Sequence, residues 1–562
     1  MRISLTEWTK SGSPWVWLNA GAVTICVIMV IGLLSLIAVR GLGHFWPADI
    51  LQAKYSLNDN QSLVIGEIVE SEQVPAEQLR DAGVIVPDGT KMMRRDLMKI
   101  GNRDVSGTDF TWVLDSNLSE RSYPAMLFAT ERREWGNFYG YLRALKEGDT
   151  LIGQYAGYDK TPEYMALWNR FEASIERALT IRKDIYQIEK HEIGAINYEL
   201  ERLRLKQRSL ELKDVADPAL YASIEARRNE LNTAYEGLQQ SLIDLHNEIN
   251  RDSIVAEISN GQQIDIAVAK IVRAFRPNDM SVPAKLAHYA DKIWEFVSDD
   301  PREANTEGGI FPAIFGTVMM VILMSVLVTP FGVVAAVYLR EYAKQGFMTR
   351  LIRIAVNNLA GVPSIVYGVF GLGFFVYFLG GNIDQLFFPE ALPSPTFGTG
   401  GLMWASITLA LLTVPVVIVA TEEGLSRIPR AVREGSLALG ATKAETLWKV
   451  VLPMASPAMM TGVILAIARA AGEVAPLMLV GVVKLAPSLP LDANYPFLHL
   501  DQKFMHLGFH IYDVGFQSPN VEAARPLVYA TALLLVVVIA LLNISAVQIR
   551  NHLREKYKSL EM

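Results

Sequence analysis

The chain has 562 residues and a formal net charge of −7; 51% of its residues are hydrophobic and 20% are charged. This combination indicates a membrane part and a water-exposed part in one polypeptide, so a lipid bilayer is the first expected partner. No basic patch favours nucleic acid as a partner, and we exclude that class of function.

Six apolar runs are long enough to cross a bilayer, for which about 20 residues are needed. They cover residues 15–40, 310–338, 354–379, 402–420, 457–482 and 526–548. The first run is too long for the apolar part of a signal peptide and lacks a small-residue cleavage site, so we expect a retained anchor. Cys26, the only cysteine, lies within this run, and no intrachain disulfide can form.

Lysine and arginine in the short loops set the expected orientation, because they gather on the cytoplasmic side. They follow the second, fourth and sixth runs, whereas 380–400 has none. We therefore expect both termini inside and the large insertion outside. The predicted organisation is an N-terminal segment with the first span (1–40), an outside insertion (41–309), a core with five spans (310–550) and a cytoplasmic tail (551–562).

The insertion shows two kinds of pattern. Short β-rich pieces such as SLVIGEIVE and FTWVL alternate with turn residues over about 58–160, which predicts a β-rich part. Over about 163–252 apolar residues recur every seven positions, for example at Ile224, Leu231, Leu238 and Leu245. With Asp217 and Pro218 starting the second helix, this predicts an antiparallel coiled-coil hairpin, which is more often a spacer or dimerisation device than a ligand site.

The remainder of the insertion, 253–300, is predicted to hold a β-hairpin and a helix. Asn260-Gly261 lies between two strand-like runs and is typical of a type I′ turn. The helix over about 283–298 leads back to the membrane.

The segment 421–453 is charged and broken by glycine, and it lies between two apolar runs on the predicted cytoplasmic side. Pro429 fits the first position of a helix, and Gly440 fits the left-handed residue after it. Thr442 and Glu445 have the spacing of a capping box, and Pro453 is expected to end the second helix. These signals predict two short helices joined at a sharp bend, which by itself could be an ordinary helical connector.

The loop has a further pattern: Glu434-Gly435-Ser436, three residues, Gly440, nine residues, then Val450-Val451-Leu452-Pro453. This spacing resembles the EAA loop of ATP-binding-cassette importer permeases. The resemblance implies that the loop docks as a coupling helix into a groove on an ATPase subunit. Gly435 and Ser436 replace two usual alanines and Val450 a usual isoleucine, but all three replacements stay small or apolar.

Arg469 and Glu473 lie in the fifth apolar run, four residues apart. A central charge costs about 3 kcal/mol on insertion scales, so each should face protein or water and have a partner. On one helix face the two can pair with each other. Arg469 can then bind an oxyanion in a translocation path with Glu473 compensating its charge when the path is empty, or the pair can be purely structural.

Three stretches extend the resemblance over residues 310–550: TPFGVVAAVYLREYA, NNLAGVPSIVYGVFGLGFFV and ARAAGEVAPLML. They resemble the PstA-type permease family of phosphate-specific ABC transporters, and GLGHFWPADI resembles a long-insert variant of it. The implied fold is α-helical, with six transmembrane helices of the type I ABC importer permease fold and an inserted mixed α+β periplasmic domain. The implied place is the bacterial inner membrane.

The resemblance also implies the substrate and the partners. These are inorganic phosphate, a second permease subunit (PstC-type), an ATPase dimer (PstB-type) and a periplasmic phosphate-binding protein (PstS-type). The implied mechanism is alternating access, in which ATPase closure pulls the loop. Another oxyanion such as sulfate or molybdate, or a coiled-coil sensor or scaffold, remains an alternative.

No G-x-x-x-x-G-K-[ST] phosphate loop occurs in the sequence, so ATP hydrolysis is expected in a separate subunit. The chain itself is expected to have no catalytic residue and no cofactor. His499, His506 and His510 lie near Asp501 and Asp513 in the last outside loop. Their irregular spacing favours hydrogen bonding within a packed lid over a zinc site.

Overall fold

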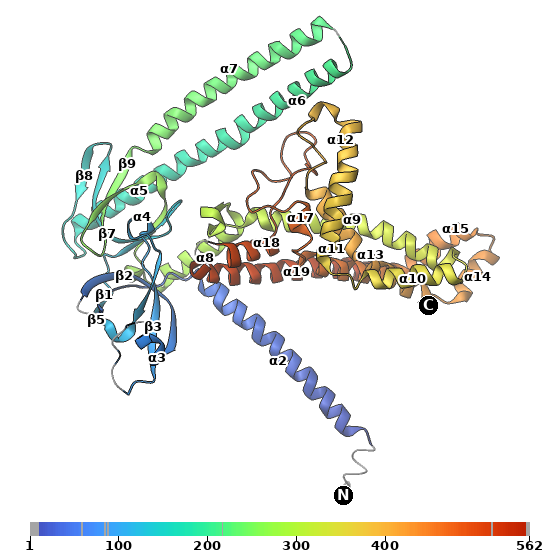
Figure 1. Ribbon diagram of the computed structural model, residues 1–562, viewed down its shortest axis with the longest axis horizontal. Helices are drawn as coiled ribbons and strands as arrows, with labels where there is room; N and C mark the ends of the chain where they lie inside the picture. The colour runs from blue at the N-terminus through green and yellow to red at the C-terminus, as the bar shows by residue number, and fades with distance from the viewer. Residues whose placement is uncertain are drawn as a thin grey trace.

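The computed structural model describes residues 11–57, 60–81, 83, 86, 89–215, 217–518 and 521–557. These residues form a bundle of long apolar helices, β-sheets beside one end of it, and a long helical hairpin that rises from the sheets (Figure 1). The sheets and the hairpin come from the segment between the first and second apolar helices, so the insertion is a mixed α and β domain.

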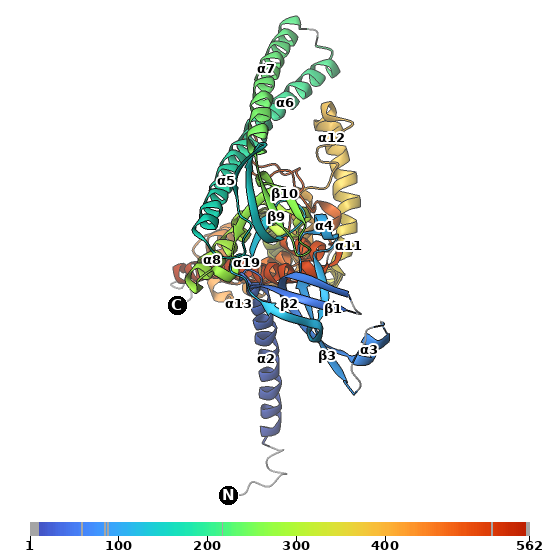
Figure 2. The same cartoon turned by 90° about the vertical axis from the view of Figure 1, so that its left-hand side faces the viewer.

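Among the described residues, six helices are long and apolar enough to cross a membrane, which confirms the predicted number. They are α2 (Ser13–Gly43), α9 (Phe311–Val337) with η6 (Tyr338–Tyr342), α11 (Ser364–Phe370) with η7 (Gly371–Gly380) and α12 (Gly381–Phe387), α13 (Leu402–Arg427), α15 (Lys443–Thr446) with η9 (Leu447–Val451) and α16 (Leu452–Ala471), and α19 (Val521–Tyr557). Helix α13 is central, because α9 and α16 pack against it and 67% of its most apolar window is buried. Helix α2 diverges from the bundle (Figures 1 and 2).

The third span begins later than predicted. The run 354–379 joins the end of a separate amphipathic helix, α10 (Phe347–Leu359), to a spanning helix that starts at Ser364. Pro363 explains the break, because it lacks an N–H and disfavours helical backbone at the residue before it. The third span therefore covers Ser364–Phe387.

The fifth span is shifted toward the N-terminus relative to the predicted 457–482. One continuous helix runs over Lys443–Ala471, and the chain leaves it at Gly472 before the short α17 (Leu477–Val480). The prediction that Pro453 ends a helix is wrong. In η9 the Leu452 N–H bonds to the Leu447 carbonyl, a π-type turn that shifts the hydrogen-bond pattern just where proline offers no donor.

The β part of the insertion consists of antiparallel sheets. One described sheet has the order β4-β3-β2-β1-β5, and another has the order β10-β9-β7-β6-β11 with β8 paired to β7. The strands are β1 (Ile50–Leu57), β2 (Asn60–Pro75), β3 (Met92–Lys99), β4 (Phe110–Leu114), β5 (Leu118–Ser122), β6 (Phe128–Arg132), β7 (Phe138–Glu147), β8 (Thr150–Gln154), β9 (Asp252–Glu257), β10 (Gln263–Ala267) and β11 (Ile271–Phe275). The short helices α3 (Ala76–Asp81) and α4 (Arg103–Ser106) lie between strands.

The helical hairpin leaves the second sheet after β8 and returns at β9. Helices α5 (Pro162–Tyr186), η2 (Gln187–Glu192) and α6 (Ile193–Leu212) form one arm, and α7 (Pro218–Ile249) returns beside it (Figure 1). Asp217 caps α7 as predicted, because its Oδ1 accepts a hydrogen bond from the Ala219 N–H at 3.0 Å. Phe171 of α5 packs in one core with Phe128 and Phe138 of the sheet. The hairpin is confirmed, and supercoiling of its helices stays a prediction.

Strands β9 and β10 form the predicted β-hairpin, but its turn is not of type I′. That turn needs a positive φ at both central residues, and of the two only Gly261 has one, +79°. The Gly261 N–H bonds to the Ile258 carbonyl, as in a type I turn followed by a left-handed glycine. The glycine therefore ends the turn rather than forming its centre.

An apolar core joins the insertion to the bundle. Helix α8 (Val282–Ser298), the predicted last helix of the insertion, contributes Phe296, which is buried together with Phe45 after α2 and Leu527 of α19. The small strands β12 (Pro301–Arg302) and β13 (Glu307–Gly308) then lead to α9. Both ends of the insertion thus meet at one place on the bundle.

The close packing of α16 against α13 depends on Gly462. A Cβ atom at this position would lie 2.7 Å from the Ala420 Cβ, whereas one at Gly32 of α2 would meet no atom within 4 Å. We expect Gly462→Val to destabilise the purified chain by about 1–3 kcal/mol through overpacking. Thermal unfolding in detergent measures the effect, with Gly32→Val as the matched control. Equal melting temperatures for the two variants would refute this packing.

Candidate functional site

The loop segment, residues 421–453, projects from the end of the bundle opposite the insertion (Figure 1). Its first helix, α14 (Arg430–Ala438), follows Pro429, which lies one position before the helix rather than at its predicted first position. Gly440 has a φ of +88°, and the Ala441 N–H bonds to the Ser436 carbonyl. Glycine adopts this left-handed backbone without steric cost, so Gly440 ends α14 as predicted.

The next helix starts with the predicted capping box. The Glu445 N–H donates to Thr442 Oγ1 at 3.2 Å, and the Thr442 N–H donates to Glu445 Oε2 at 2.9 Å. The hydroxyls of Ser436 and Thr446 are 2.9 Å apart and link the two helices across the bend. Since its caps and this link are all made within the loop, the bend has one defined shape.

Arg433 connects the loop segment to the second span. Its guanidinium donates to the Glu341 carboxylate at 2.9 Å and to the Leu425 and Ile428 carbonyls at 2.8 and 2.7 Å. The Lys443 ammonium lies 4.4 Å from the centre of the Tyr342 ring. Glu341 and Tyr342 belong to η6, so the loop is held to the end of α9.

Sequence reasoning missed this connection. It counted Arg433 only as an inside charge and did not weigh Glu341. The available signal was that Glu341 is the one acidic residue in the basic stretch 340–353. A single acidic residue among basic ones indicates that it forms an ion pair, but the sequence does not identify the basic residue that it pairs with.

The outer surface of the loop segment is exposed and partly apolar. No residue of α14 is buried, and Leu439 and Trp448 are 91% and 76% exposed. Of the predicted loop residues, Glu434, Gly435, Ser436 and Gly440 lie on this projection, whereas Leu452 and Pro453 lie in the long helix that follows. Exposed large apolar side chains on a structured bend indicate a protein partner.

Arg469 and Glu473 do pair, but not along one helix face. Arg469 lies in the last turn of α16 and Glu473 lies beyond its end, after Gly472. Their Nε and Oε1 atoms are 3.5 Å apart, and the side chains are 32% and 20% exposed. In the described part of the chain neither side chain has another ion pair or hydrogen bond. The arginine therefore keeps N–H donors that no described protein group accepts.

The turn that carries Glu473 is packed against the third span. A Cβ at Gly368 would lie 2.7 Å from the Pro476 Cα, and one at Gly371 would lie 2.9 Å from the Val480 side chain. Glycine at these two positions allows this close approach. At Gly373 a Cβ would meet no atom within 4 Å, so this glycine is not needed for packing.

The three histidines of the last predicted outside loop have separate roles. His499 lies 2.9 Å from Asp492, His506 Nδ1 accepts from the Gly508 N–H, and His510 Nδ1 lies 3.4 Å from the Thr531 hydroxyl. Burial lowers the pKa of His506 to about 3, so this imidazole is neutral. Across the described ranges no three His, Cys, Asp or Glu side chains are grouped to hold a metal ion.

Comparisons with known proteins agree on one family. The family described as binding-protein-dependent transport system inner membrane component matches residues 328–558. Phosphate transport system permease protein PstA 1 of Mycobacterium tuberculosis (strain CDC 1551 / Oshkosh) is 37% identical over 245 residues, which cover 43% of this chain and 71% of that protein. A probable phosphate transport system permease protein PstA of Methanocaldococcus jannaschii is 32% identical over 189 residues, covering 33% of this chain and 60% of that protein.

Among solved structures, a chain of the inward-facing MetNI methionine ABC transporter is 19% identical. The match covers 49% of this chain and 99% of that chain, with a TM-score of 0.33. A score of this size supports no structural argument, so the family assignment comes from the sequence matches.

The shape of the loop segment depends on Gly440 in a way that a second glycine can test. Neither Gly440 nor Gly435 has an atom within 4 Å of an added Cβ, but only Gly440 has a positive φ. We expect Gly440→Ala to weaken α14 by about 1 kcal/mol through left-handed strain. Gly435→Ala should strengthen it by up to about 1 kcal/mol through helix propensity. Hydrogen exchange of the α14 amides measures both, and the same sign for the two variants would contradict the assigned turn.

Proposed function

The chain belongs to the binding-protein-dependent transport permeases, in the PstA-type group, and from this premise we propose that it imports inorganic phosphate with energy from ATP. It is a multi-pass inner membrane protein and a transport component. Its fold is the one predicted, an importer permease with six spans and an inserted mixed domain. The names of the two phosphate transport permeases that it resembles support phosphate as the substrate.

The observation that carries the proposal is the loop segment. It is a projecting bend whose shape is set by Gly440 and the Thr442–Glu445 capping box, and whose surface exposes Leu439 and Trp448. We propose that this surface docks on an ATPase subunit, with Glu434 at the contact. Since the chain has no phosphate loop for ATP, hydrolysis would occur in that partner, a PstB-type dimer.

Force from the ATPase would reach the spans through the contacts of the loop. Arg433 holds it to Glu341 at the end of α9, and Leu447 and Val451 pack with Leu425 of α13 in one apolar cluster. A loop fastened to two spans moves them as units rather than bending by itself. This arrangement supports alternating access as the mechanism.

Arg469 and Glu473 are proposed as the substrate pathway residues. Arginine presents a planar fork of N–H donors that can bind two oxygens of a tetrahedral oxyanion. Its ion pair with Glu473 has an N···O distance of 3.5 Å, so the two side chains can separate without the loss of a short hydrogen bond. When phosphate enters, the free N–H groups would bind it. When phosphate leaves, Glu473 would compensate the charge again.

The proposal includes an orientation and a set of partners. Both termini and the loop segment would face the cytoplasm, and the insertion 41–309 would face the periplasm, following the distribution of lysine and arginine. A PstC-type permease would complete the translocation path, and a PstS-type protein would deliver phosphate. Sulfate and molybdate share the tetrahedral geometry, whereas a sensor or scaffold finds no support in a family of transport components.

Removal of the Arg469 charge tests the pathway. We expect Arg469→Gln to lower phosphate uptake at least tenfold, about 1.4 kcal/mol, because the charged donors to the oxyanion are lost. Uptake by cells with equal amounts of permease in the membrane measures this. Arg208→Gln removes an arginine that is 52% exposed in the helical hairpin and should leave uptake unchanged. Undiminished uptake by Arg469→Gln would refute the pathway, and equal loss of sulfate uptake would favour a broader oxyanion importer.

Charge reversal at Glu434 tests the docking. We expect Glu434→Lys to reduce the phosphate moved per ATP hydrolysed severalfold, since the variant reverses the charge at the proposed contact. The ratio is measured in vesicles that contain the assembled transporter. Glu230→Lys is the matched control, because Glu230 is also exposed, at 68%, but lies in α7, outside the loop segment. An unchanged ratio for Glu434→Lys would argue against docking at this position.

A further inference from the structure

A cavity of about 690 Å³ lies where the insertion meets the bundle. Its wall includes the end of α2, the start of α19, strands β2 and β3, and helix α8. None of the residues of the loop segment or of the Arg469–Glu473 pair lines it. The cavity is therefore separate from the site described above, and the transport proposal gives it no role.

Two arginines stand at the membrane side of the cavity. Arg40 lies in the last turn of α2 and Arg525 near the start of α19, and each has a guanidinium nitrogen 3.7 Å from the Glu70 carboxylate. The two arginines are 60% and 58% exposed. Two positive charges share one negative charge, so this side has an excess of positive charge. Since both arginines end apolar spans, they lie at the level of lipid head groups.

The inner part of the cavity holds three ionisable side chains that are not in an ion pair with any described residue. Within the described ranges Lys99, Glu67 and Glu307 form no ion pair, although all three line the cavity. Burial raises the pKa of Glu67, and it raises the pKa of Glu307 to about 7. A charge left unpaired in a poorly solvated place is costly. When both carboxyl groups are ionised, they outnumber the single ammonium group of Lys99, and a cation placed beside them favours that ionised form.

With every lining group ionised the cavity has no net charge, because six cationic and six acidic side chains line it. A free anion would therefore gain little from the complete lining, and so would a free cation. A ligand that has both charges would meet the arginines with its anion and the carboxyl groups with its cation. The charges thus favour a zwitterion in a single orientation.

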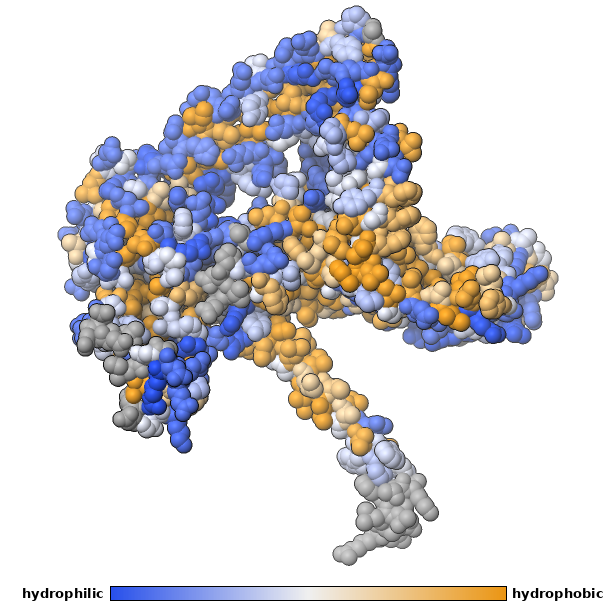
Figure 3. Space-filling model, in the orientation of Figure 1, coloured by the Kyte–Doolittle hydropathy of each residue, from blue (hydrophilic) through white to orange (hydrophobic). Residues whose placement is uncertain are grey.

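Apolar residues at the membrane side favour a lipid over a small soluble zwitterion. Val39, Phe45 and Leu527 line the cavity beside the two arginines. Helix α2 diverges from α19 below this point, and its exposed surface is apolar along its length (Figures 1 and 3). Acyl chains can therefore lie between the two helices while the head group enters the cavity.

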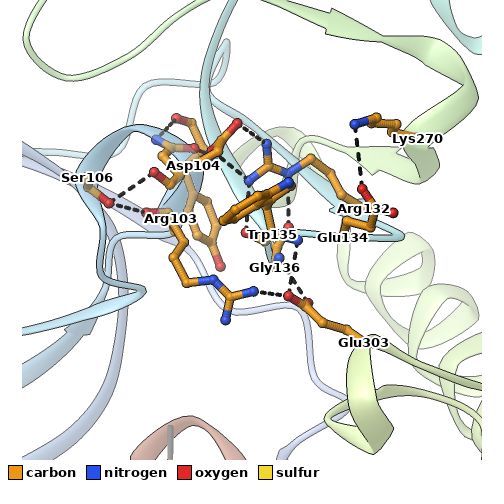
Figure 4. A network of polar contacts seen from close by, with 12 residues as sticks. Arg103, Asp104, Ser106, Arg132, Glu134, Trp135, Gly136, Lys270 and Glu303 are labelled. Atoms are coloured by element: carbon orange, nitrogen blue, oxygen red, sulfur yellow. Dashed lines mark hydrogen bonds and ion pairs between the residues drawn. The ribbon is translucent and has the colours of Figure 1, made fainter. Parts of the chain in front are cut away.

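One wall of the cavity is held rigid by a polar network (Figure 4). The Glu303 carboxylate accepts hydrogen bonds from the Trp135 and Gly136 N–H groups, each at 3.0 Å, and from Arg103. Trp135 and Gly136 both have a positive φ, which turns their two amides toward one anion. A wall fixed in this way is preorganised for a ligand and loses little entropy on binding.

We propose that this cavity binds the head group of a zwitterionic phospholipid, with its phosphate at Arg40 and Arg525 and its primary ammonium near Glu67 and Glu307. The lipid belongs to the leaflet on the side of the insertion. It fastens the insertion to the first and last spans, which meet here where Gly41 contacts the Ala530 backbone. An anionic lipid lacks the cation for the inner carboxyl groups and binds less well.

Native mass spectrometry of the full chain, released from nanodiscs with equal amounts of phosphatidylethanolamine and phosphatidylglycerol, tests the proposal. We expect the wild-type chain to retain phosphatidylethanolamine at least tenfold over phosphatidylglycerol. The double variant Glu67→Gln/Glu307→Gln should lose this preference, and Arg40→Gln/Arg525→Gln should retain neither lipid. Lys54→Gln/Glu120→Gln removes an exposed ion pair outside the cavity and should behave like wild type.

The wild-type competition decides the question even if a double variant fails to fold. Equal retention of the two lipids, or retention of neither, would overturn the proposal. A rise in the melting temperature with millimolar inorganic phosphate, without lipid retention, would overturn it in favour of an anion site. None of these readouts depends on transport, so a failure here and a failure of the importer proposal are distinguishable.

Discussion

The ion pair between Arg433 and Glu341 joins the loop segment to the end of the second span. Both side chains are largely buried, at 18% and 13% exposure, so the pair is little screened by solvent. Arg433 also binds the carbonyls that end α13, which brings two spans and the bend into one unit. The apolar cluster of Leu425, Leu447 and Val451 adds to this attachment. Any displacement of the loop is therefore shared with α9 and α13.

From this unit the connection continues through the bundle to the insertion. Helix α9 begins directly after β13, and Ile310 at its start is buried with Phe296 of α8 and Phe45 after α2. The end of α2, the end of α8 and the start of α9 therefore meet in a single apolar core. The polar network around Glu303 and the proposed lipid site lie beside this core, so the insertion is attached to the spans rather than tethered by a flexible chain.

The bundle itself combines long apolar helices with local departures from α-helical geometry. The π-type turns η6 and η9 occur at the loop segment, η7 lies within the third span, and the break at Gly472 lies between the two residues of the charged pair. In an apolar environment, backbone N–H and C=O groups need hydrogen-bond partners. A π-type turn keeps these groups bonded while it changes the direction of the side chains that follow.

The features that the sequence alone determined depend on residues close together in the chain. The six spans follow from the lengths of the apolar runs. The bend follows from Gly440 and the Thr442–Glu445 capping box, and the start of α7 follows from Asp217, because these caps are hydrogen bonds between residues near in sequence. Hydrophobic length alone did not determine the ends of the third and fifth spans, which follow from the break at Pro363 and from the π-type turn in η9. Only tertiary structure paired Arg433 with Glu341, 92 residues apart, and brought Arg40 and Arg525 to one cavity. These arrangements depend on packing between distant segments, and no local pattern encodes which distant residue becomes the partner.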